Sequence, residues 1–284
     1  MLKVKINGKT YDAEKGEFIL DVCRRNRILV PTLCHHDGIA GLGACRLCVV
    51  EVKEGKNIQV VVSCIYPLDR DCEVFTESET IKKIRKTILS MLKTRAPSGD
   101  RLASLCQIYG VEETKRFTPP NAVKGSSGKS RKTPGTAEKQ LSSSCVLCGL
   151  CVKACSSLGT GAISTAERGV TKKISTPYGE PSADCIGCGS CASVCPTKAI
   201  ECTESGGQRT IWGRKFKLIR CYSCDTAFAT KEEYFRALEK ADLEYRDARA
   251  VAPDHAPLPE DILCDVCRKK KSAGVFAAAF GERV

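Results

Sequence analysis

The chain has 284 residues, of which 20 are cysteine and only 6% are aromatic. This length allows two or three small domains, and so few large side chains exclude one large aromatic core. The formal net charge of +12 counts every cysteine as neutral. Metal-bound thiolates would bring the charge down to roughly +4, which removes the main argument for a nucleic-acid partner.

Apolar and charged residues alternate at the N-terminus, over residues 1–6, and no apolar segment of a secretory signal follows. The cysteines are grouped in Cys-x2-Cys units, which in a cytoplasmic protein favour metal ligation over disulfide bonds. The sequence has no run of about 18 apolar residues that could cross a bilayer. We therefore expect a cytoplasmic protein that does not insert into a membrane.

Residues 1–77 are predicted to form a small domain with a mixed sheet. Asn7-Gly8 lies between two short alternating segments, as is typical of a β-hairpin. Apolar side chains at helical spacing predict one short helix over Glu17–Asn26. The predicted strands are Lys3–Ile6, Thr10–Ala13, Val49–Val52, Ile58–Ser63 and Cys72–Thr76.

Residues 78–117 are predicted to be helical. Apolar side chains recur at i, i+3 and i+4 over residues 78–94, and lysine and arginine occupy the other face. A second helix is predicted over Leu102–Tyr109. Residues 118–140 are rich in proline, glycine, serine and lysine and hold little apolar material. This segment is therefore predicted to be a flexible linker.

Residues 141–209 contain an internal repeat, whose two copies begin at Cys145 and Cys185. Each copy has the spacing Cys-x2-Cys-x2-Cys-x3-Cys of a bacterial-type ferredoxin with two [4Fe–4S] clusters. In this motif three cysteines of one loop bind one cluster, and the fourth binds the other. The predicted ligands are Cys145, Cys148, Cys151 and Cys195 for the first cluster, and Cys185, Cys188, Cys191 and Cys155 for the second.

Another cysteine set lies in the first domain, with the spacing Cys34-x10-Cys45-x2-Cys48-x15-Cys64. This is not the plant-type ferredoxin spacing. Residues 31–52 (PTLCHHDGIAGLGACRLCVVEV), with Ser63-Cys64 and Pro67, resemble the N-terminal [2Fe–2S] domain of the electron-input subunits of complex I and of NAD-linked and iron-only hydrogenases. The resemblance implies a β-grasp domain whose [2Fe–2S] ligands are Cys34, Cys45, Cys48 and Cys64.

The sequence departs from this family in the helical segment. Many relatives hold an additional [4Fe–4S] cluster there, bound by one histidine and three cysteines. Residues 94–111 contain no histidine and a single cysteine, Cys106, so we expect no cluster in this segment. The sequence also lacks the downstream cysteine motifs of an iron-only hydrogenase, so we do not expect it to split hydrogen by that chemistry.

Residues 210–284 contain two more Cys-x2-Cys pairs, Cys221/Cys224 and Cys264/Cys267. Two such pairs far apart in a chain are typical of a structural zinc site. A further iron–sulfur cluster of the [2Fe–2S] type is the alternative, and both remain open at this point. Between the pairs, a helix is predicted near Thr230–Ala241, starting with a capping box of Thr230 and Glu233.

Four cysteines remain outside these sets, and we expect them to be structural: Cys23, Cys72, Cys106 and Cys202. The three histidines, His35, His36 and His255, are expected in exposed loops. A Rieske centre would need two separately placed histidine ligands. The sequence has neither a GxGxxG motif after a strand nor a complete phosphate loop. We therefore expect no nucleotide or flavin site.

Three cluster sets and the family resemblance point to an electron-transfer subunit. We expect a non-catalytic, diaphorase-type subunit of an NAD(P)-linked or electron-bifurcating hydrogenase, in an anaerobic cell. The resemblance implies three partner subunits, with a ferredoxin as a further candidate partner. They are a flavin- and NAD(P)-binding subunit, a thioredoxin-like [2Fe–2S] subunit and a catalytic hydrogenase subunit. The alternatives are a subunit of an NAD(P)-dependent formate dehydrogenase and a free multi-cluster ferredoxin.

Overall fold

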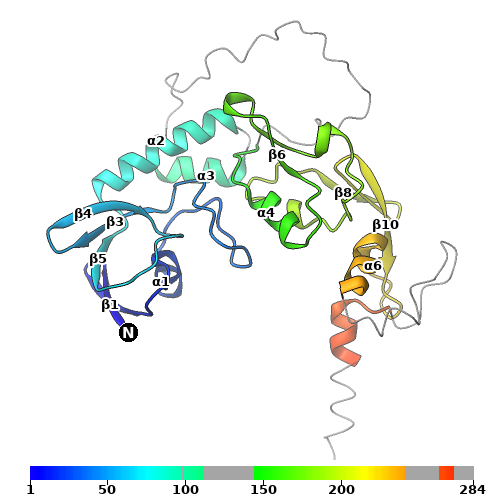
Figure 1. Ribbon diagram of the computed structural model, residues 1–284, viewed down its shortest axis with the longest axis horizontal. Coiled ribbons are helices and arrows are strands. Elements are labelled where there is room, and N and C mark those ends of the chain that lie inside the picture. Colours follow the sequence, from blue (N-terminus) through cyan, green and yellow to red (C-terminus); the bar gives the residue numbers. More distant parts are fainter. Residues whose placement is uncertain (98, 112–143, 241–261, 272–284) are drawn as a thin grey trace, which may run out of the picture. The chain divides into compact units, whose positions relative to one another are not determined.

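The computed structural model describes residues 1–97, 99–111, 144–240 and 262–271. The chain forms two compact units, Met1–Glu180 with Ser190–Glu201, and Pro181–Gly189 with Cys202–Val284. Both units combine helices and sheets (Figure 1), so the predicted α+β class is confirmed. The linker predicted at 118–140 lies outside the described residues. The division into five segments remains a prediction.

The N-terminal sheet has five strands in the order β2-β1-β5-β3-β4. Strands β1 and β5 are parallel, and the other neighbours are antiparallel. Asn7 and Gly8 both have positive φ, 48° and 89°, as a two-residue hairpin turn requires. The strands are β1 (Leu2–Ile6), β2 (Lys9–Ala13), β3 (Val49–Glu54), β4 (Asn57–Val62) and β5 (Cys72–Phe75).

Helix α1 (Ile19–Arg25) contributes its apolar face to the core of this sheet. Ile19, Leu20 and Val22 are completely buried together with inward-facing valines and isoleucines of the strands. The helix begins later than predicted because Phe18 is still extended, with φ −79° and ψ 143°. One helix packed on a five-stranded mixed sheet is the arrangement that the resemblance implied.

Helices α2 (Glu79–Arg95) and α3 (Asp100–Ile108) follow the sheet and pack against each other. The N-cap of α2 is Ser78, whose hydroxyl accepts a 3.3 Å hydrogen bond from the N–H of Ile81. This bond satisfies one of the free donors of the first turn. Helix α3 begins two residues before the predicted start, after the extended residue Gly99.

Arg85 lies on the face of α2 that the sequence pattern assigned to solvent, but its side chain is completely buried. Its guanidinium donates to the carbonyl oxygens of Leu47 at 3.0 Å and Val49 at 2.9 Å, and it pairs with Glu77 at 2.5 Å. A buried charge requires such partners. Arg85 thus ties α2 to the backbone on both sides of Cys48.

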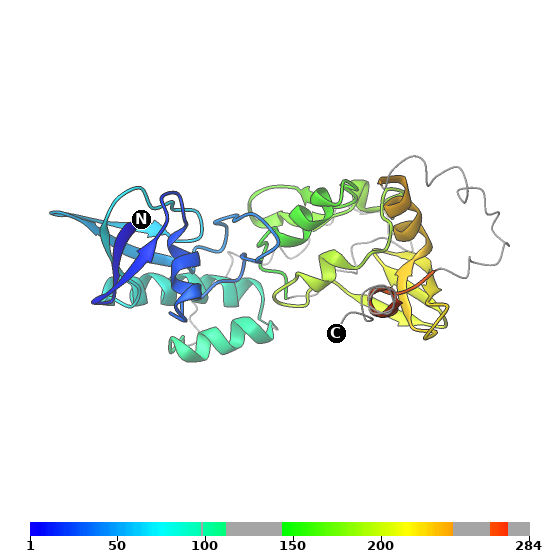
Figure 2. The ribbon, with the colours of Figure 1, turned by 90° about the horizontal axis from the view of Figure 1, so that it is seen from below.

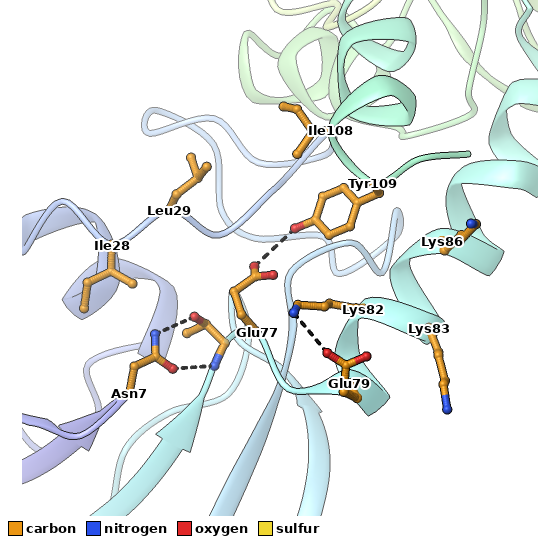
Figure 3. A pocket seen from close by; sticks show the side chains of 11 residues that line it. Asn7, Ile28, Leu29, Glu77, Glu79, Lys82, Lys83, Lys86, Ile108 and Tyr109 are labelled. Carbon is orange, nitrogen blue, oxygen red and sulfur yellow. Dashed lines mark hydrogen bonds and ion pairs between the residues drawn. The ribbon is translucent and has the colours of Figure 1, made fainter. Parts of the chain in front are cut away.

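A pocket of about 590 Å³ lies where α2 begins and α3 ends (Figure 3). In its lining Asn7 exchanges two hydrogen bonds with Thr76, at 2.7 and 2.9 Å, which join the ends of β1 and β5. Tyr109 and Glu77 also line it, and the Tyr109 hydroxyl donates to Glu77 at 3.2 Å. Its lining contains no cysteine, so this pocket is not part of the metal centres described below.

The rest of the first unit holds two short helices and a small hairpin. Helix α4 (Leu150–Ser157) packs against α5 (Ser190–Ser193), and β6 (Ser164–Ala166) pairs antiparallel with β7 (Lys173–Ser175). Short 3-10 turns span Gly169–Thr171 and Pro177–Gly179. Both short helices follow cysteine loops of the repeat, so this part of the fold places predicted ligands.

The second unit contains an antiparallel sheet in the order β11-β10-β9-β8, and α6 packs against it (Figures 1 and 2). The capping box is confirmed, because Glu233 N–H donates to Thr230 Oγ1 at 3.1 Å and Thr230 N–H donates to Glu233 Oε2 at 3.3 Å. A further helix spans residues 265–271. The bounds are β8 (Cys202–Ser205), β9 (Gln208–Ile211), β10 (Arg214–Arg220), β11 (Ala227–Thr230) and α6 (Lys231–Lys240).

The helices of the described residues include none with the length and apolar character needed to span a bilayer.

Candidate metal centres

The four cysteines of the N-terminal set lie in buried loops around the edge of β3 and β4. Cys34 and Cys45 belong to the long loop after α1, Cys48 directly precedes β3, and Cys64 follows β4. All four are at most 7% exposed. The N–H of Cys45 donates to Cys34 Sγ at 3.2 Å, and the N–H of Leu33 donates to Cys45 Sγ at 3.4 Å. Backbone donors of this kind stabilise thiolates.

These four thiols fall into two hydrogen-bonded pairs. A hydrogen bond from Cys34 lowers the pKa of Cys45 to about 6, and the same bond raises the pKa of Cys34. A hydrogen bond from Cys64 lowers the pKa of Cys48 to about 7 and raises that of Cys64. Two pairs of adjacent thiols match the need of a two-iron cluster, in which each iron takes two protein ligands.

Two glycines let the loop approach these thiols closely. A β-carbon at Gly41 would lie 2.6 Å from the carbonyl oxygen of Cys64, and one at Gly43 would lie 2.7 Å from the side chain of Ile65. Gly43 also has a φ of +57°, which side chains disfavour. The loop therefore wraps this site only because both positions lack a side chain.

His35, which follows Cys34, does not lie in an exposed position as expected. Its side chain is only 10% exposed, and its Nδ1 has no hydrogen-bond partner among the described residues. Burial lowers its pKa below the usual value. His36 is exposed, as predicted, and His255 lies outside the described residues.

The first loop of the repeat places Cys145, Cys148 and Cys151 before and within the start of α4. Leu147 and Gly149 have positive φ, 52° and 81°, which bends the loop around its own thiols. Burial raises the pKa of Cys148 to about 11, and the charges of nearby cysteines add to this shift. Cys195 acts in this way on all three thiols of the loop. Cys195 thus lies near the first loop, although it belongs to the second motif.

One apolar cluster connects this loop to the N-terminal site. We call it the shared cluster. It contains buried residues of the N-terminal loop, of α2, α3 and their flanks, and of the first repeat loop. A β-carbon at Gly149 would lie 3.6 Å from Leu42 Cδ1, and the charge of Cys45 contributes to the raised pKa of Cys148. Its buried members are Leu33, Cys34, Cys45, Leu47, Leu89, Ala96, Leu102, Cys106, Val111, Val146, Cys148 and Leu150.

The cysteines of the second predicted [4Fe–4S] set belong to both units. Cys185 and Cys188 lie in the second unit, in the segment Pro181–Gly189, and Cys191 and Cys155 lie in the first, in α5 and α4. The thiol of Cys155 lies 3.0 Å from Thr160 Oγ1. Their assignment to one cluster remains a prediction.

The C-terminal cysteines form the most compact group of thiols in the described part of the chain. The sulfurs of Cys221, Cys224, Cys264 and Cys267 all lie within 4.8 Å of one another. The Cys224–Cys264 distance is 3.7 Å. Cys264 N–H donates to Cys221 Sγ at 3.3 Å, and this bond is the main cause that lowers the pKa of Cys221 to about 6. Among the described residues, no other group of potential ligand atoms gathers this closely.

The four cysteines outside the ligand sets are free thiols. Cys23 belongs to the core under the N-terminal sheet, and Cys106 belongs to the shared cluster. Cys72 and Cys202 are partly buried. Burial raises the pKa of each of the four thiols, which fits the expected structural role.

Two protein-family models match the chain at the places where these thiols gather. A "2Fe-2S iron-sulfur cluster binding domain" matches residues 1–79, and a "4Fe-4S dicluster domain" matches residues 144–199. The chain is an iron–sulfur protein. Both domain types agree with the predicted clusters, whereas neither model reaches the C-terminal four-cysteine site, so the metal at that site is not identified.

Curated relatives support the resemblance seen in the sequence. The chain is 28% identical over 210 residues to the NADH-ubiquinone oxidoreductase 75 kDa subunit of Reclinomonas americana. It is 30% identical over 217 residues to the NADP-reducing hydrogenase subunit HndD of Solidesulfovibrio fructosivorans. Both matches cover 70% of this chain but only 29% and 36% of the relatives. This iron–sulfur chain is a homologue of both, and it spans about a third of their length.

A solved structure shares the fold. The crystal structure of an NAD+-reducing [NiFe]-hydrogenase in the H2-reduced state matches with a TM-score of 0.56 at 24% identity, covering 70% of this chain and 86% of the matched chain.

The sequence pattern did not reveal the proximity of Leu42 and Gly149, because the two residues lie more than 100 positions apart and neither side chain is a metal ligand. It also did not reveal the partners of Arg85.

Proposed function

We propose that the chain relays single electrons between a flavin- and NAD(P)-binding subunit and a catalytic subunit, with hydrogenase as the favoured reaction. Iron–sulfur clusters supply one-electron oxidation and reduction. The homologous relatives are named as NADH- and NADP-linked oxidoreductases, which supports this class of complex. A thioredoxin-like [2Fe–2S] subunit and a ferredoxin are further proposed partners, and the location we propose is the cytoplasm.

The proposed ligands follow the cysteine sets. Cys34, Cys45, Cys48 and Cys64 would hold the [2Fe–2S] cluster, and the two thiol pairs described above support this. Cys145, Cys148, Cys151 and Cys195 would hold one [4Fe–4S] cluster, supported by the charge of Cys195 at the first loop. Cys185, Cys188, Cys191 and Cys155 would hold the other.

The observation that carries the relay is the shared cluster. Cys45 and Cys148 are both buried members of this cluster, and all its side chains come from this chain. The Leu42 side chain lies beside Gly149, where a β-carbon would be 3.6 Å from Leu42 Cδ1, so the two ligand loops are close to each other. We therefore propose that electrons pass directly between the [2Fe–2S] and first [4Fe–4S] sites, without a partner's cofactor. The helical segment that holds a further cluster in relatives here supplies Leu102 and Cys106 as packing.

We further propose that the C-terminal cysteines bind one zinc ion. A Zn–S bond of about 2.3 Å places tetrahedral ligand sulfurs about 3.8 Å apart. The four sulfurs within 4.8 Å, with one pair at 3.7 Å, fit this spacing. A two-iron cluster distributes its ligands over two metal ions and needs wider separations between the pairs. The geometry thus favours one ion over the [2Fe–2S] alternative.

Metal analysis and EPR of protein purified without oxygen test these proposals. We expect about ten irons and one zinc per chain. We also expect the [2Fe–2S] EPR signal to relax faster once the first [4Fe–4S] cluster is reduced, because adjacent paramagnets couple. About twelve irons without zinc would contradict the zinc proposal, and an unchanged relaxation rate would contradict the direct relay.

Native co-purification tests the assembly. We expect flavin- and hydrogenase-containing partners to remain bound to the chain. Recovery with molybdenum-containing formate dehydrogenase subunits would replace hydrogenase as the reaction. A monomer that keeps every cluster and exchanges electrons with several reductases would contradict the subunit role.

A further inference from the structure

The loop with Cys185 and Cys188 is held by the C-terminal sheet. The segment Pro181–Gly189 and the strands β8–β11 belong to the same compact unit. The sheet presents polar side chains to the carbonyl oxygens of this loop, in contrast to the apolar surroundings of the first loop.

Arg214, at the start of β10, contacts more carbonyl oxygens of this loop than any other side chain of the sheet described here. Its Nη1 lies 2.8 Å from the carbonyl oxygen of Ser182, 2.9 Å from that of Ala183 and 2.7 Å from that of Cys185. The guanidinium also lies over the ring of Phe216, 4.8 Å from its centroid. Since Nη1 carries two hydrogens, the three carbonyl groups share them. One cation therefore gathers the backbone that leads into Cys185.

The two following carbonyl groups are held by other strands of the same sheet. Thr230 Oγ1, at the end of β11, donates to the carbonyl of Ile186 at 2.5 Å. Arg209 Nη1, in β9, donates to the carbonyl of Gly187 at 2.9 Å. Three successive carbonyl groups, of residues 185, 186 and 187, are thus bound by side chains of the sheet.

Phe216 determines how closely the loop approaches the sheet. It is completely buried, and a β-carbon at Gly187 would lie 2.5 Å from its ring. Gly187 has a φ of +68°. The loop can therefore rest on the sheet only with glycine at this position.

The held carbonyl groups determine where the N–H groups point. In a planar trans peptide the N–H points opposite to the C=O. With the carbonyls of residues 185–187 bound to the sheet, the N–H groups of Ile186, Gly187 and Cys188 point away from it. In the first loop, the N–H at the position equivalent to Gly187, that of Leu147, donates to the thiol of Cys145. Aligned backbone N–H groups form an electropositive concavity that suits anionic iron–sulfur sites.

We propose that Arg214 is a positioning residue that raises the reduction potential of the cluster bound by Cys185 and Cys188. This inference rests on the proposed function, because it assumes that these cysteines bind a [4Fe–4S] cluster. Hydrogen bonds to the sulfurs and nearby positive charge both favour the reduced, more negative state of a cluster. Arg214 supplies the charge, and with Thr230 and Arg209 it aims the N–H donors.

The test is an EPR-monitored redox titration of the full chain, purified without oxygen, in four variants. Arg214→Gln removes the charge and the fork of donors, and Arg214→Lys keeps the charge. Thr230→Val removes the carbonyl partner of Ile186, together with the hydroxyl that caps α6, without changing charge. Lys217→Gln is the matched control, because Lys217 is an exposed cation on the same strand.

We expect Arg214→Gln to lower the potential of one [4Fe–4S] cluster so that its reduced fraction falls about tenfold relative to the oxidised, a shift of about 59 mV for one electron. The other [4Fe–4S] cluster and the [2Fe–2S] cluster should keep their potentials. Thr230→Val should shift the same cluster in the same direction by less, Arg214→Lys should restore most of the potential, and Lys217→Gln should change nothing.

Equal potentials in Arg214→Gln and Lys217→Gln, at full iron content, would overturn the inference and leave the proposed function intact. If Arg214→Gln loses about four irons or does not fold, the Thr230→Val titration decides: a lowered potential supports the inference, and an unchanged one overturns it. Wild-type protein with only one [4Fe–4S] cluster would instead contradict the ligand assignment, before any variant is compared.

Discussion

The two loops of the cysteine repeat have the same ligand spacing but different support. The first loop, with Cys145 and Cys148, packs into the apolar shared cluster. The second, with Cys185 and Cys188, is held by arginine and threonine side chains of a sheet. A motif thus selects the kind of metal centre, whereas the packing around it sets burial, hydrogen bonding and charge, which tune a cluster's potential.

The largest expected effects come from removing one ligand in each loop. Cys148→Ser and Cys188→Ser should each lower the iron content by up to about four. Only Cys148→Ser should abolish the faster relaxation of the [2Fe–2S] EPR signal. The reason is that only the first loop packs into the apolar shared cluster that also contains Cys45. Iron analysis and EPR measure both. Cys106→Ser should retain all the iron, and an equal loss of coupling in Cys188→Ser would show that the loops are not distinct in this way.

Loss of the C-terminal metal should affect the second loop and spare the first. Cys221 follows β10 directly, and Arg214 starts the same strand. We expect Cys221→Ser to lose the zinc, to increase proteolysis of the second unit and to alter the spectrum of one [4Fe–4S] cluster. Zinc analysis and limited proteolysis measure this. An unchanged digestion pattern after complete zinc loss would remove the structural role from this site.

Truncation of an apolar residue in the shared cluster should weaken the first loop's support. Leu102 is 1% exposed, so Leu102→Ala should destabilise the first unit by about 2–5 kcal/mol. Urea unfolding followed by the visible absorption of the [2Fe–2S] cluster would measure the change. Leu29→Ala is the control, because Leu29 is 78% exposed and should shift stability by less than about 0.5 kcal/mol. Equal losses of stability in Leu102→Ala and Leu29→Ala would contradict a stabilising role of the shared cluster.

The smallest expected effect concerns the helix that supports the first loop. Ser78→Ala removes the N-cap of α2 and should cost about 1 kcal/mol. Ser104→Ala, within α3, should have almost no effect because Ser104 is exposed and alanine favours helices. The same urea titration compares the two variants. A loss in Ser104→Ala as large as in Ser78→Ala would point to something other than capping.

The cysteine sets, most elements and the capping box of α6 could be predicted from the sequence, because spacing and periodicity are local. The burial of Arg85 could not, since the carbonyl groups that bind it lie more than 35 positions away. The covered His35 and the Arg214 contacts also depend on segments brought together by folding. Local patterns predicted the candidate metal ligands, whereas tertiary packing determines what surrounds them.

The long interval between Cys34 and Cys45 has a mechanical consequence. Its residue Leu42 lies beside Gly149 of the first repeat loop. The interval therefore connects the N-terminal domain to the first loop of the cysteine repeat. Plant-type spacing leaves only four residues between the corresponding cysteines, too short to include such a residue. We therefore expect that shortening the interval would slow electron transfer between the two proposed sites while keeping every predicted ligand.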